Sequence, residues 1–78
     1  METGTLNSRS VTSMTEIAEI VKAARKQQRL TQADLANKAH TGVRFIVDLE
    51  SGKATCQVGK VLQVMTTLGL LVNINKAV

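Results

Sequence analysis

Residues 31–52 read TQADLANKAHTGVRFIVDLESG, and this segment predicts two short helices separated by a tight break. Thr31 is a good N-cap for the first helix, and Asp34 lies in the first turn, where the helix dipole favours an acid. Only about eight residues of this helix are helical, so tertiary packing must hold it. The second helix is expected from about Val43 to Ser51, and Gly52 can end it in the left-handed conformation.

Two longer apolar patterns flank this helix pair. On its N-terminal side, Ser13 and Glu16 fit a capping box that opens a helix. On its C-terminal side, a helix is expected from about Val58 to Leu68, with Gly69 as its left-handed end. The apolar stripes that these two helices are expected to bury are Ile17, Ile20, Val21 and Ala24 in the first, and Val58, Val61, Leu62, Met65 and Leu68 in the second.

The two ends of the chain differ from its helical part. Residues 1–13 hold six Ser or Thr without an apolar period, which predicts a flexible arm before a domain at 14–69. Residues 70–75 read LLVNIN and predict a strand within a dimerisation segment, 70–78. Because the chain offers no second strand, we expect it to pair with the same strand of a second molecule about a two-fold axis. The residues expected to make this contact are Leu70, Leu71, Val72 and Ile74.

The composition restricts the class of protein. A chain of 78 residues, with 44% hydrophobic content and a net charge of +4, suits one small domain. The core of so small a domain is marginally stable by itself, so we expect a partner subunit to bury further surface. One cysteine and one histidine exclude an intrachain disulfide and a structural zinc site on ligand count. No apolar run approaches the roughly 20 residues of a membrane span. We therefore expect a cytoplasmic, nucleoid-associated protein without a membrane partner, a metal or a cofactor.

Short helices with a four-residue break, in a small basic domain, are typical of the helix-turn-helix. Several motifs at fixed spacings resemble the Xre/Cro-type helix-turn-helix repressors over roughly residues 15–70. These motifs are LTQADLA at 30–36, Ile46, LESGK at 49–53 and LGL at 68–70. Within that family the chain looks most like the HipB-type antitoxins, through TGVRFI at 41–46 and the strand after Gly69. The resemblance implies a mainly α, four- or five-helix Cro/C1-type domain with a short C-terminal β-strand pairing across a dimer.

The same resemblance implies roles for individual residues. In such repressors the glutamine that opens the first helix of the pair contacts a phosphate, and outward-facing residues of the second helix read base edges. Arg44 is the one strong reader, able to make a bidentate pair with guanine. Asp48 can accept from cytosine, or it can orient Arg44 one turn back. The implied DNA-binding residues are Gln32, Gly42, Val43, Arg44, Val47, Asp48, Ser51 and Lys53.

Two further positions stand out against the family pattern. The family pairs an arginine of its first helix with the glutamate of its Glu-x-Gly segment, which implies a structural ion pair between Arg25 and Glu50. The turn position that usually carries glycine holds His40 here, and histidine tolerates the left-handed region at some cost. The next position is usually apolar and is Thr41 in this chain.

Three functions fit these observations. The first is a dimeric, sequence-specific repressor that binds an inverted-repeat operator in double-stranded DNA, represses its own operon and acts as the antitoxin of a HipA-like kinase toxin. The second is a stand-alone Xre-type regulator without a toxin. The third is a protein-interaction module that kept the helix-turn-helix as a scaffold and lost DNA binding. An enzyme is not expected, because no pairing of a nucleophile with a base is visible.

Overall fold

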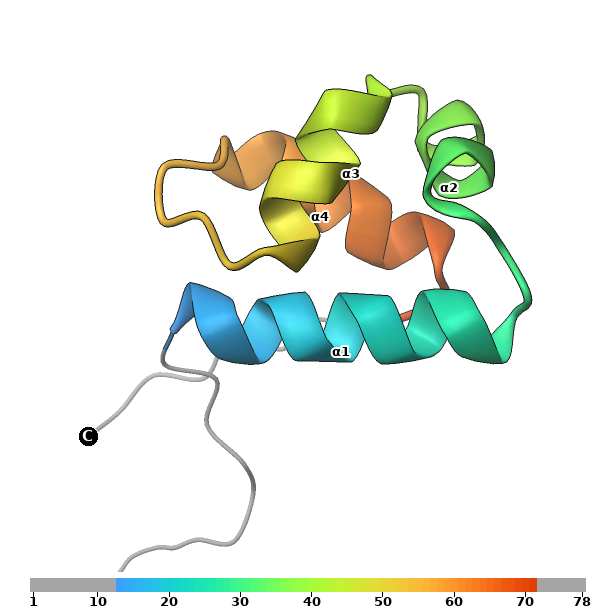
Figure 1. Ribbon diagram of the computed structural model, residues 1–78, viewed down its shortest axis with the longest axis horizontal. Coiled ribbons are helices and arrows are strands. Elements are labelled where there is room, and N and C mark those ends of the chain that lie inside the picture. The colour runs from blue at the N-terminus through green and yellow to red at the C-terminus, as the bar shows by residue number, and fades with distance from the viewer. Residues whose placement is uncertain (1–12, 72–78) are drawn as a thin grey trace, which may run out of the picture.

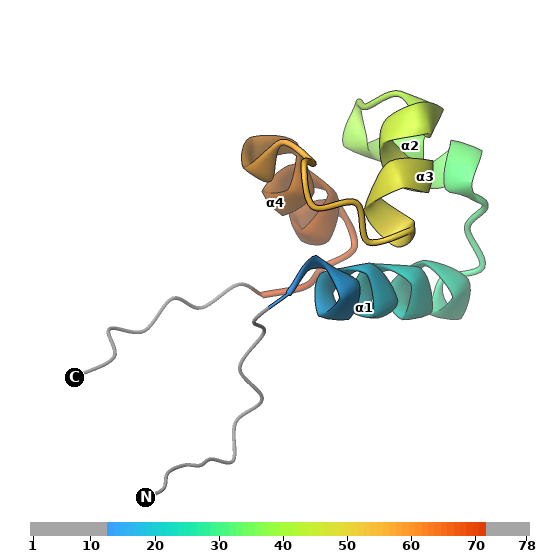
Figure 2. The same cartoon turned by 60° about the vertical axis from the view of Figure 1, so that its left-hand side comes forward.

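Four helices follow one another along residues 13–71, which are the residues that this computed structural model describes. They are α1 (Met14–Gln27), α2 (Gln32–Ala39), α3 (Val43–Glu50) and α4 (Val58–Thr67). Helix α1 lies along one side of the domain, and the three shorter helices pack together beside it (Figures 1 and 2). The mainly α helix-turn-helix fold predicted from the sequence is therefore confirmed, with four helices in this part of the chain.

The two predicted end segments lie largely outside the described residues, since residues 1–12 and 72–78 are not described. Ser13, the last residue of the predicted arm, is the N-cap of α1, as the capping-box pattern predicted. Residues 70–71 are described and are not in a strand. Pairing of the 70–75 strand across a dimer therefore stays a prediction.

Side chains cap the first two helices. Ser13 Oγ accepts the Glu16 N–H at 3.3 Å, as the sequence predicted. At α2 the capping box is complete, because Thr31 Oγ1 accepts the Asp34 N–H and the Asp34 carboxylate accepts the Thr31 N–H, both at 2.9 Å. Hydrogen bonding of the Asp34 carboxyl to the backbone N–H of Thr31, and to a smaller extent to the Thr31 side chain, lowers the pKa of that carboxyl. The caps fix where each helix begins, and thereby the bend between α1 and α2.

All four helices end in the same way. A residue with positive φ follows the last turn, and the next residue donates its N–H to a carbonyl five positions back. Two of these left-handed residues are glycines, Gly52 at φ 83° and Gly69 at φ 78°, as predicted. The other two are Arg29 at φ 60° and His40 at φ 58°. The histidine was predicted for that position, whereas nothing in the sequence marked the arginine.

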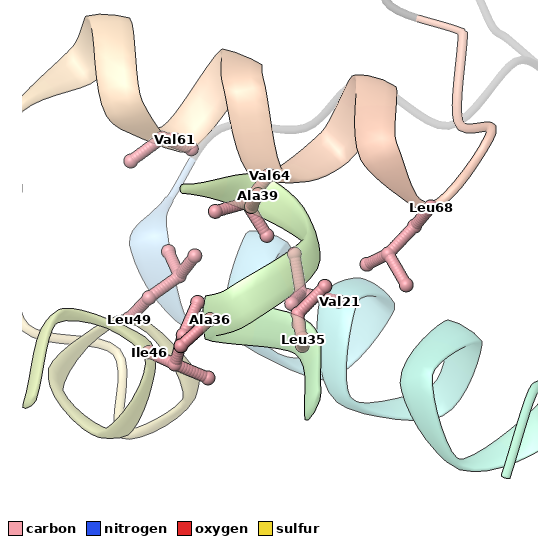
Figure 3. Close-up of a cluster of buried hydrophobic side chains, with 9 residues drawn as sticks. All are labelled: Val21, Leu35, Ala36, Ala39, Ile46, Leu49, Val61, Val64 and Leu68. Carbon is pink, nitrogen blue, oxygen red and sulfur yellow. The ribbon is translucent and has the colours of Figure 1, made fainter. Parts of the chain in front are cut away.

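The core lies where the four helices meet (Figure 3). Its buried side chains are Val21, Leu35, Ala36, Ala39, Ile46, Leu49, Val61, Val64 and Leu68. Ile46 and Leu49 of α3 are fully buried in this cluster, and Phe45 packs half-buried at its border. Helices α1 and α4 are also joined at their C-terminal ends, because Gln28 Nε2 donates to the Leu68 carbonyl at 2.8 Å.

The apolar face predicted for the last helix was partly wrong. Val58 is 68% exposed and Leu62 is 40% exposed, whereas Val64, which the predicted stripe left out, is fully buried. The side of α4 that packs against α2 is centred on Val61, Val64 and Leu68, and this direction depends on how the helices meet rather than on hydrophobicity along α4. The side chain of Gln63 strengthens this contact by donating to the Ala39 carbonyl of α2.

The turn between α2 and α3 holds a buried polar atom. Thr41 Oγ1 is buried and has no hydrogen-bond partner among residues 13–71. Thr41→Val should therefore raise the free energy of unfolding by about 1 kcal/mol, because a methyl group replaces a hydroxyl that lost its water on folding. Urea denaturation followed by circular dichroism measures this change. The matched substitution Thr55→Val, at an exposed site, should stay within about 0.5 kcal/mol of the unchanged protein. A less stable Thr41→Val would mean that the hydroxyl has a partner.

Candidate nucleic-acid interface

Helix α3 turns one side to solvent. Gly42 is its N-cap, without a side-chain capping bond, and the first residues after it are exposed: Val43 is 47% exposed and the Arg44 side chain 83%. Val47 and Asp48, one turn further on, are half-buried. These four residues were predicted to face outward. The first two are clearly exposed, and the two nearer the end of the helix are exposed only in part.

Asp48 contacts three of the other residues that were predicted to bind DNA. Its Oδ1 lies 3.3 Å from Arg44 Nε, and its Oδ2 lies 3.6 Å from Lys53 Nζ. Its backbone carbonyl accepts the Ser51 hydroxyl at 2.7 Å and the Lys53 N–H at 3.1 Å. The left-handed turn at Gly52 makes this possible, because it folds the chain back so that Lys53 returns to the side of α3. Arg44, Asp48, Ser51 and Lys53 therefore form one group.

The contact with Asp48 leaves the two terminal nitrogens of the Arg44 guanidinium available for other partners. The contact that Asp48 makes with the guanidinium is at Nε, and neither terminal nitrogen of Arg44 makes a hydrogen bond within residues 13–71. A guanidinium fork can present two parallel N–H donors to a planar acceptor pair. Guanine offers such a pair through O6 and N7 in the major groove. The geometry thus leaves Arg44 chemically able to make the contact that the sequence implied.

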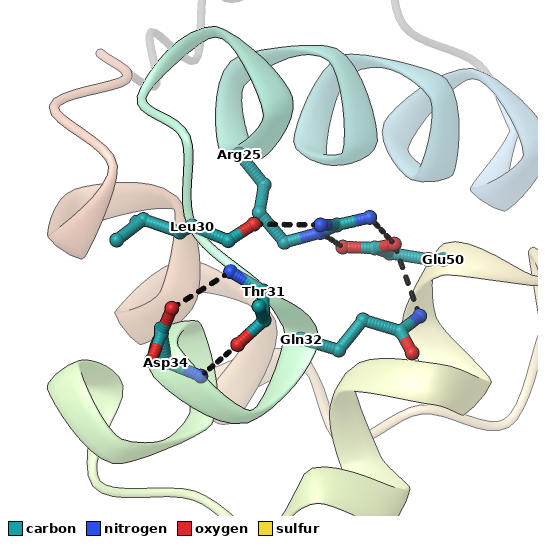
Figure 4. A network of polar contacts seen from close by, with 6 residues as sticks. All are labelled: Arg25, Leu30, Thr31, Gln32, Asp34 and Glu50. Atoms are coloured by element: carbon teal, nitrogen blue, oxygen red, sulfur yellow. Dashed lines mark hydrogen bonds and ion pairs between the residues drawn. The ribbon is translucent and has the colours of Figure 1, made fainter.

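The predicted ion pair between Arg25 and Glu50 is present and lies inside the domain (Figure 4). Arg25 Nε donates to Glu50 Oε2 at 2.6 Å and Nη2 donates to Oε1 at 3.0 Å, while Nη1 donates to the Leu30 carbonyl at 2.7 Å. The side chains are only 11% and 3% exposed. This bidentate pair joins α1 to the last residue of α3.

Gln32 belongs to this buried network rather than to the Asp48 group. Its Nε2 donates to Glu50 Oε1 at 3.2 Å, and the side chain is held at the start of α2 (Figure 4). An amide nitrogen carries two N–H donors, and the contact with Glu50 uses one of them, so the predicted phosphate contact of Gln32 stays a prediction. Sequence reasoning missed this link, because residues 32 and 50 meet only through the packing of α2 on α3.

Two other residues near α3 were not assigned a role. Lys60 Nζ lies 5.8 Å from the centroid of the Phe45 ring, which places another positive charge beside the helix. Burial raises the pKa of the Cys56 thiol, and the Asp48 carboxylate raises it further, against the opposite effect of Lys53. The thiol is therefore protonated at neutral pH and a poor nucleophile.

The predicted dimer residues are only partly within the described chain. Leu70 is half-buried against the core and Leu71 is 88% exposed, while Val72 and Ile74 lie outside residues 13–71. Over the described residues there is no cluster of histidine, cysteine and acidic side chains that could hold a metal ion. No helix in that part of the chain is long and apolar enough to cross a membrane.

Comparison with known sequences agrees with this geometry. The model of a helix-turn-helix family matches residues 21–71, which include the helix pair and α4. The uncharacterized HTH-type transcriptional regulator y4mF of Sinorhizobium fredii (strain NBRC 101917 / NGR234) is 54% identical over 59 residues. The matched region covers 76% of this chain and 78% of that regulator.

Solved structures show the same fold. HipB in a complex with the O4 20mer superposes with a TM-score of 0.78 at 23% identity, covering 88% of this chain and 97% of HipB. A HipA-HipB-O2-O3 complex contains a similar chain, with a TM-score of 0.78 at 22% identity over 87% of this chain and 96% of that one. The resemblance to HipB-type proteins inferred from the sequence is confirmed at the level of the fold.

Proposed function

Because the chain belongs to the helix-turn-helix family of DNA-binding transcriptional regulators, we propose that it is a dimeric repressor of its own operon and the antitoxin of a HipA-like kinase. The observation that carries DNA binding is the outward side of α3. There, Arg44 projects into solvent with its terminal nitrogens open, and Lys53 stands beside it. Two cations on the exposed side of a recognition helix favour DNA over a protein-interaction module without DNA binding.

An exposed apolar residue at the C-terminal end of the described chain supports the proposed dimer. Leu71 is 88% exposed, and it is the second residue of the 70–75 segment that was predicted to form a strand. An exposed leucine next to further apolar residues is expected to be covered in the functional protein. Pairing of 70–75 between two copies would cover it and would relate the two α3 helices by a two-fold axis.

The toxin partnership is supported by the likeness of the fold to HipB, one structure of which includes HipA. A stand-alone regulator is the second candidate, because the 54% identical relative is described only as a transcriptional regulator. Both candidates share the DNA-binding surface and differ in whether a neighbouring gene product binds the dimer.

A gel-shift assay on the DNA upstream of the chain's own gene tests the proposal. We expect a retarded complex with that DNA but not with a coding fragment of equal length, and a further shift when the neighbouring gene product is added. Binding to the upstream DNA without a further shift when the neighbouring gene product is added would favour the stand-alone regulator. No binding to the upstream DNA would contradict autorepression.

Arg44→Ala should relax the sequence preference at one base position. Losing a bidentate guanine contact costs roughly 1–3 kcal/mol there, while other positions keep their preference. Competition binding among single-base operator variants measures this effect. Gln32→Ala serves as the comparison and should weaken binding to all variants alike, since a phosphate contact carries no sequence information. If Arg44→Ala leaves the preferences unchanged, Arg44 does not read a base.

A further inference from the structure

We propose that Asp48 is a specificity-determining residue that holds Arg44 for base reading and keeps it away from DNA phosphates. The inference rests on the proposed DNA binding and assigns a role to a side chain whose charge opposes it. An acid on the DNA-facing side of a helix repels phosphates, so its presence there lowers affinity for DNA of any sequence.

The contacts of Asp48 point to a positioning role. Arg44 is 83% exposed, and an exposed arginine without a partner samples many rotamers. Asp48 lies one helical turn away, is only 21% exposed, and has its Oδ1 3.3 Å from Arg44 Nε. Its other oxygen faces Lys53. The carboxylate thus stands between two cations and restrains both.

This restraint affects specific and non-specific DNA differently. With Nε paired to Asp48, Arg44 keeps its terminal nitrogens for a partner that lies along the guanidinium axis. An arginine released from Asp48 can turn to the nearest phosphate, which every DNA sequence offers. Removing the charge of Asp48 should therefore strengthen binding to any DNA and weaken discrimination among sequences.

The rival role for Asp48 is direct acceptance of a hydrogen bond from cytosine. That role depends on the carboxylate and the base alone, so its loss would be felt with or without Arg44. A positioning role depends on Arg44 and should vanish when the arginine is absent. A double-mutant cycle separates the two roles.

The test compares the unchanged protein with Asp48→Asn, Arg44→Ala and the double variant. Each is titrated with a duplex enriched from a random library by the unchanged protein, and with a scrambled duplex of the same composition. Asp48→Asn should bind the scrambled duplex about three- to tenfold more tightly at low salt, and its enriched-to-scrambled affinity ratio should fall roughly tenfold. In the Arg44→Ala background, Asp48→Asn should leave that ratio unchanged.

Glu19→Gln is the matched control, because it makes the same change in net charge at an exposed site on α1. It should leave the affinity ratio unchanged, which separates the position of the charge from its amount. Nuclear magnetic resonance of the Arg44 Nε–H gives a reading without DNA: its order parameter should fall in Asp48→Asn and stay constant in Glu19→Gln.

Three results would decide against these ideas, each in a different way. An unchanged affinity ratio and an unchanged Arg44 order parameter in Asp48→Asn would overturn the positioning role. A loss of discrimination that persists in the Arg44→Ala background would assign Asp48 to direct base reading instead. An unchanged protein that prefers no duplex over its scrambled form would contradict the proposed function itself.

Discussion

Glu50→Ala should lower the free energy of unfolding by about 3–5 kcal/mol, because it leaves the Arg25 guanidinium buried without its counter-charge. The Glu50 carboxylate is 3% exposed and accepts three hydrogen bonds, two from Arg25 and one from Gln32. Domains of this kind are stable by only about 5–15 kcal/mol, and a small one lies near the lower limit. Urea denaturation followed by circular dichroism should find the variant largely unfolded at low urea.

The double variant Arg25→Met, Glu50→Leu distinguishes the cost of an unpaired charge from the value of the pair. Replacing a whole buried ion pair by apolar residues of similar size is often neutral or stabilising, so the double variant should recover most of the loss. Lys53→Ala, which breaks the exposed contact with Asp48, should change stability by less than about 1 kcal/mol. Equal losses for Glu50→Ala and Lys53→Ala would show that the buried pair is not the support described here.

Inserting about five base pairs between the two half-sites of the operator should abolish binding of the proposed dimer. A two-fold dimer presents its α3 helices to successive major grooves, about 34–36 Å or roughly 10 base pairs apart. The insertion rotates one half-site by about half a turn, so only one α3 can engage. We expect the affinity to fall towards the non-specific level, which typically lies about 10³-fold or more below specific binding.

Gel shifts with an operator of altered spacing measure this effect, and a duplex with equally many base changes outside the half-sites is the control. Each half-site should contain a guanine for Arg44, next to a thymine whose methyl group can meet Val43 or Val47. Retained affinity for the spaced operator would show that the two α3 helices are not rigidly coupled. With few polar readers on α3, bending of the DNA supplies the remaining discrimination in this proposal.

Local signals predicted the helices well because caps act locally. The last helix of the pair was expected from Val43 to Ser51 and is Val43–Glu50, and the final helix was expected from 58 to 68 and is Val58–Thr67. The buried side of that final helix was harder, since Val58 and Leu62 are as apolar as Val64. The direction from which α2 packs against the final helix decides which of these three side chains is buried.

The contacts of the candidate site that lie within one helix could be predicted from the sequence, and those that depend on a turn could not. The four-residue spacing of Arg44 and Asp48 left two roles open for the acid, acceptance from cytosine or orientation of the arginine, and the structure has the two side chains in contact. The bond between Gln32 and Glu50 and the return of Lys53 to Asp48 were not predicted. Both depend on where the chain goes after a turn, and no pattern of residue types along a helix contains that information.

The carboxylate at the end of α3 has a further consequence for how the protein meets DNA. Glu50 joins α3 to α1 through Arg25 and to α2 through Gln32, so a shift of α3 alone would break these hydrogen bonds. The domain should therefore dock as a preformed rigid body, and no interaction energy is lost to ordering the recognition helix. The heat-capacity change on binding should accordingly reflect dehydration of the contact surface, without the larger contribution that accompanies coupled folding.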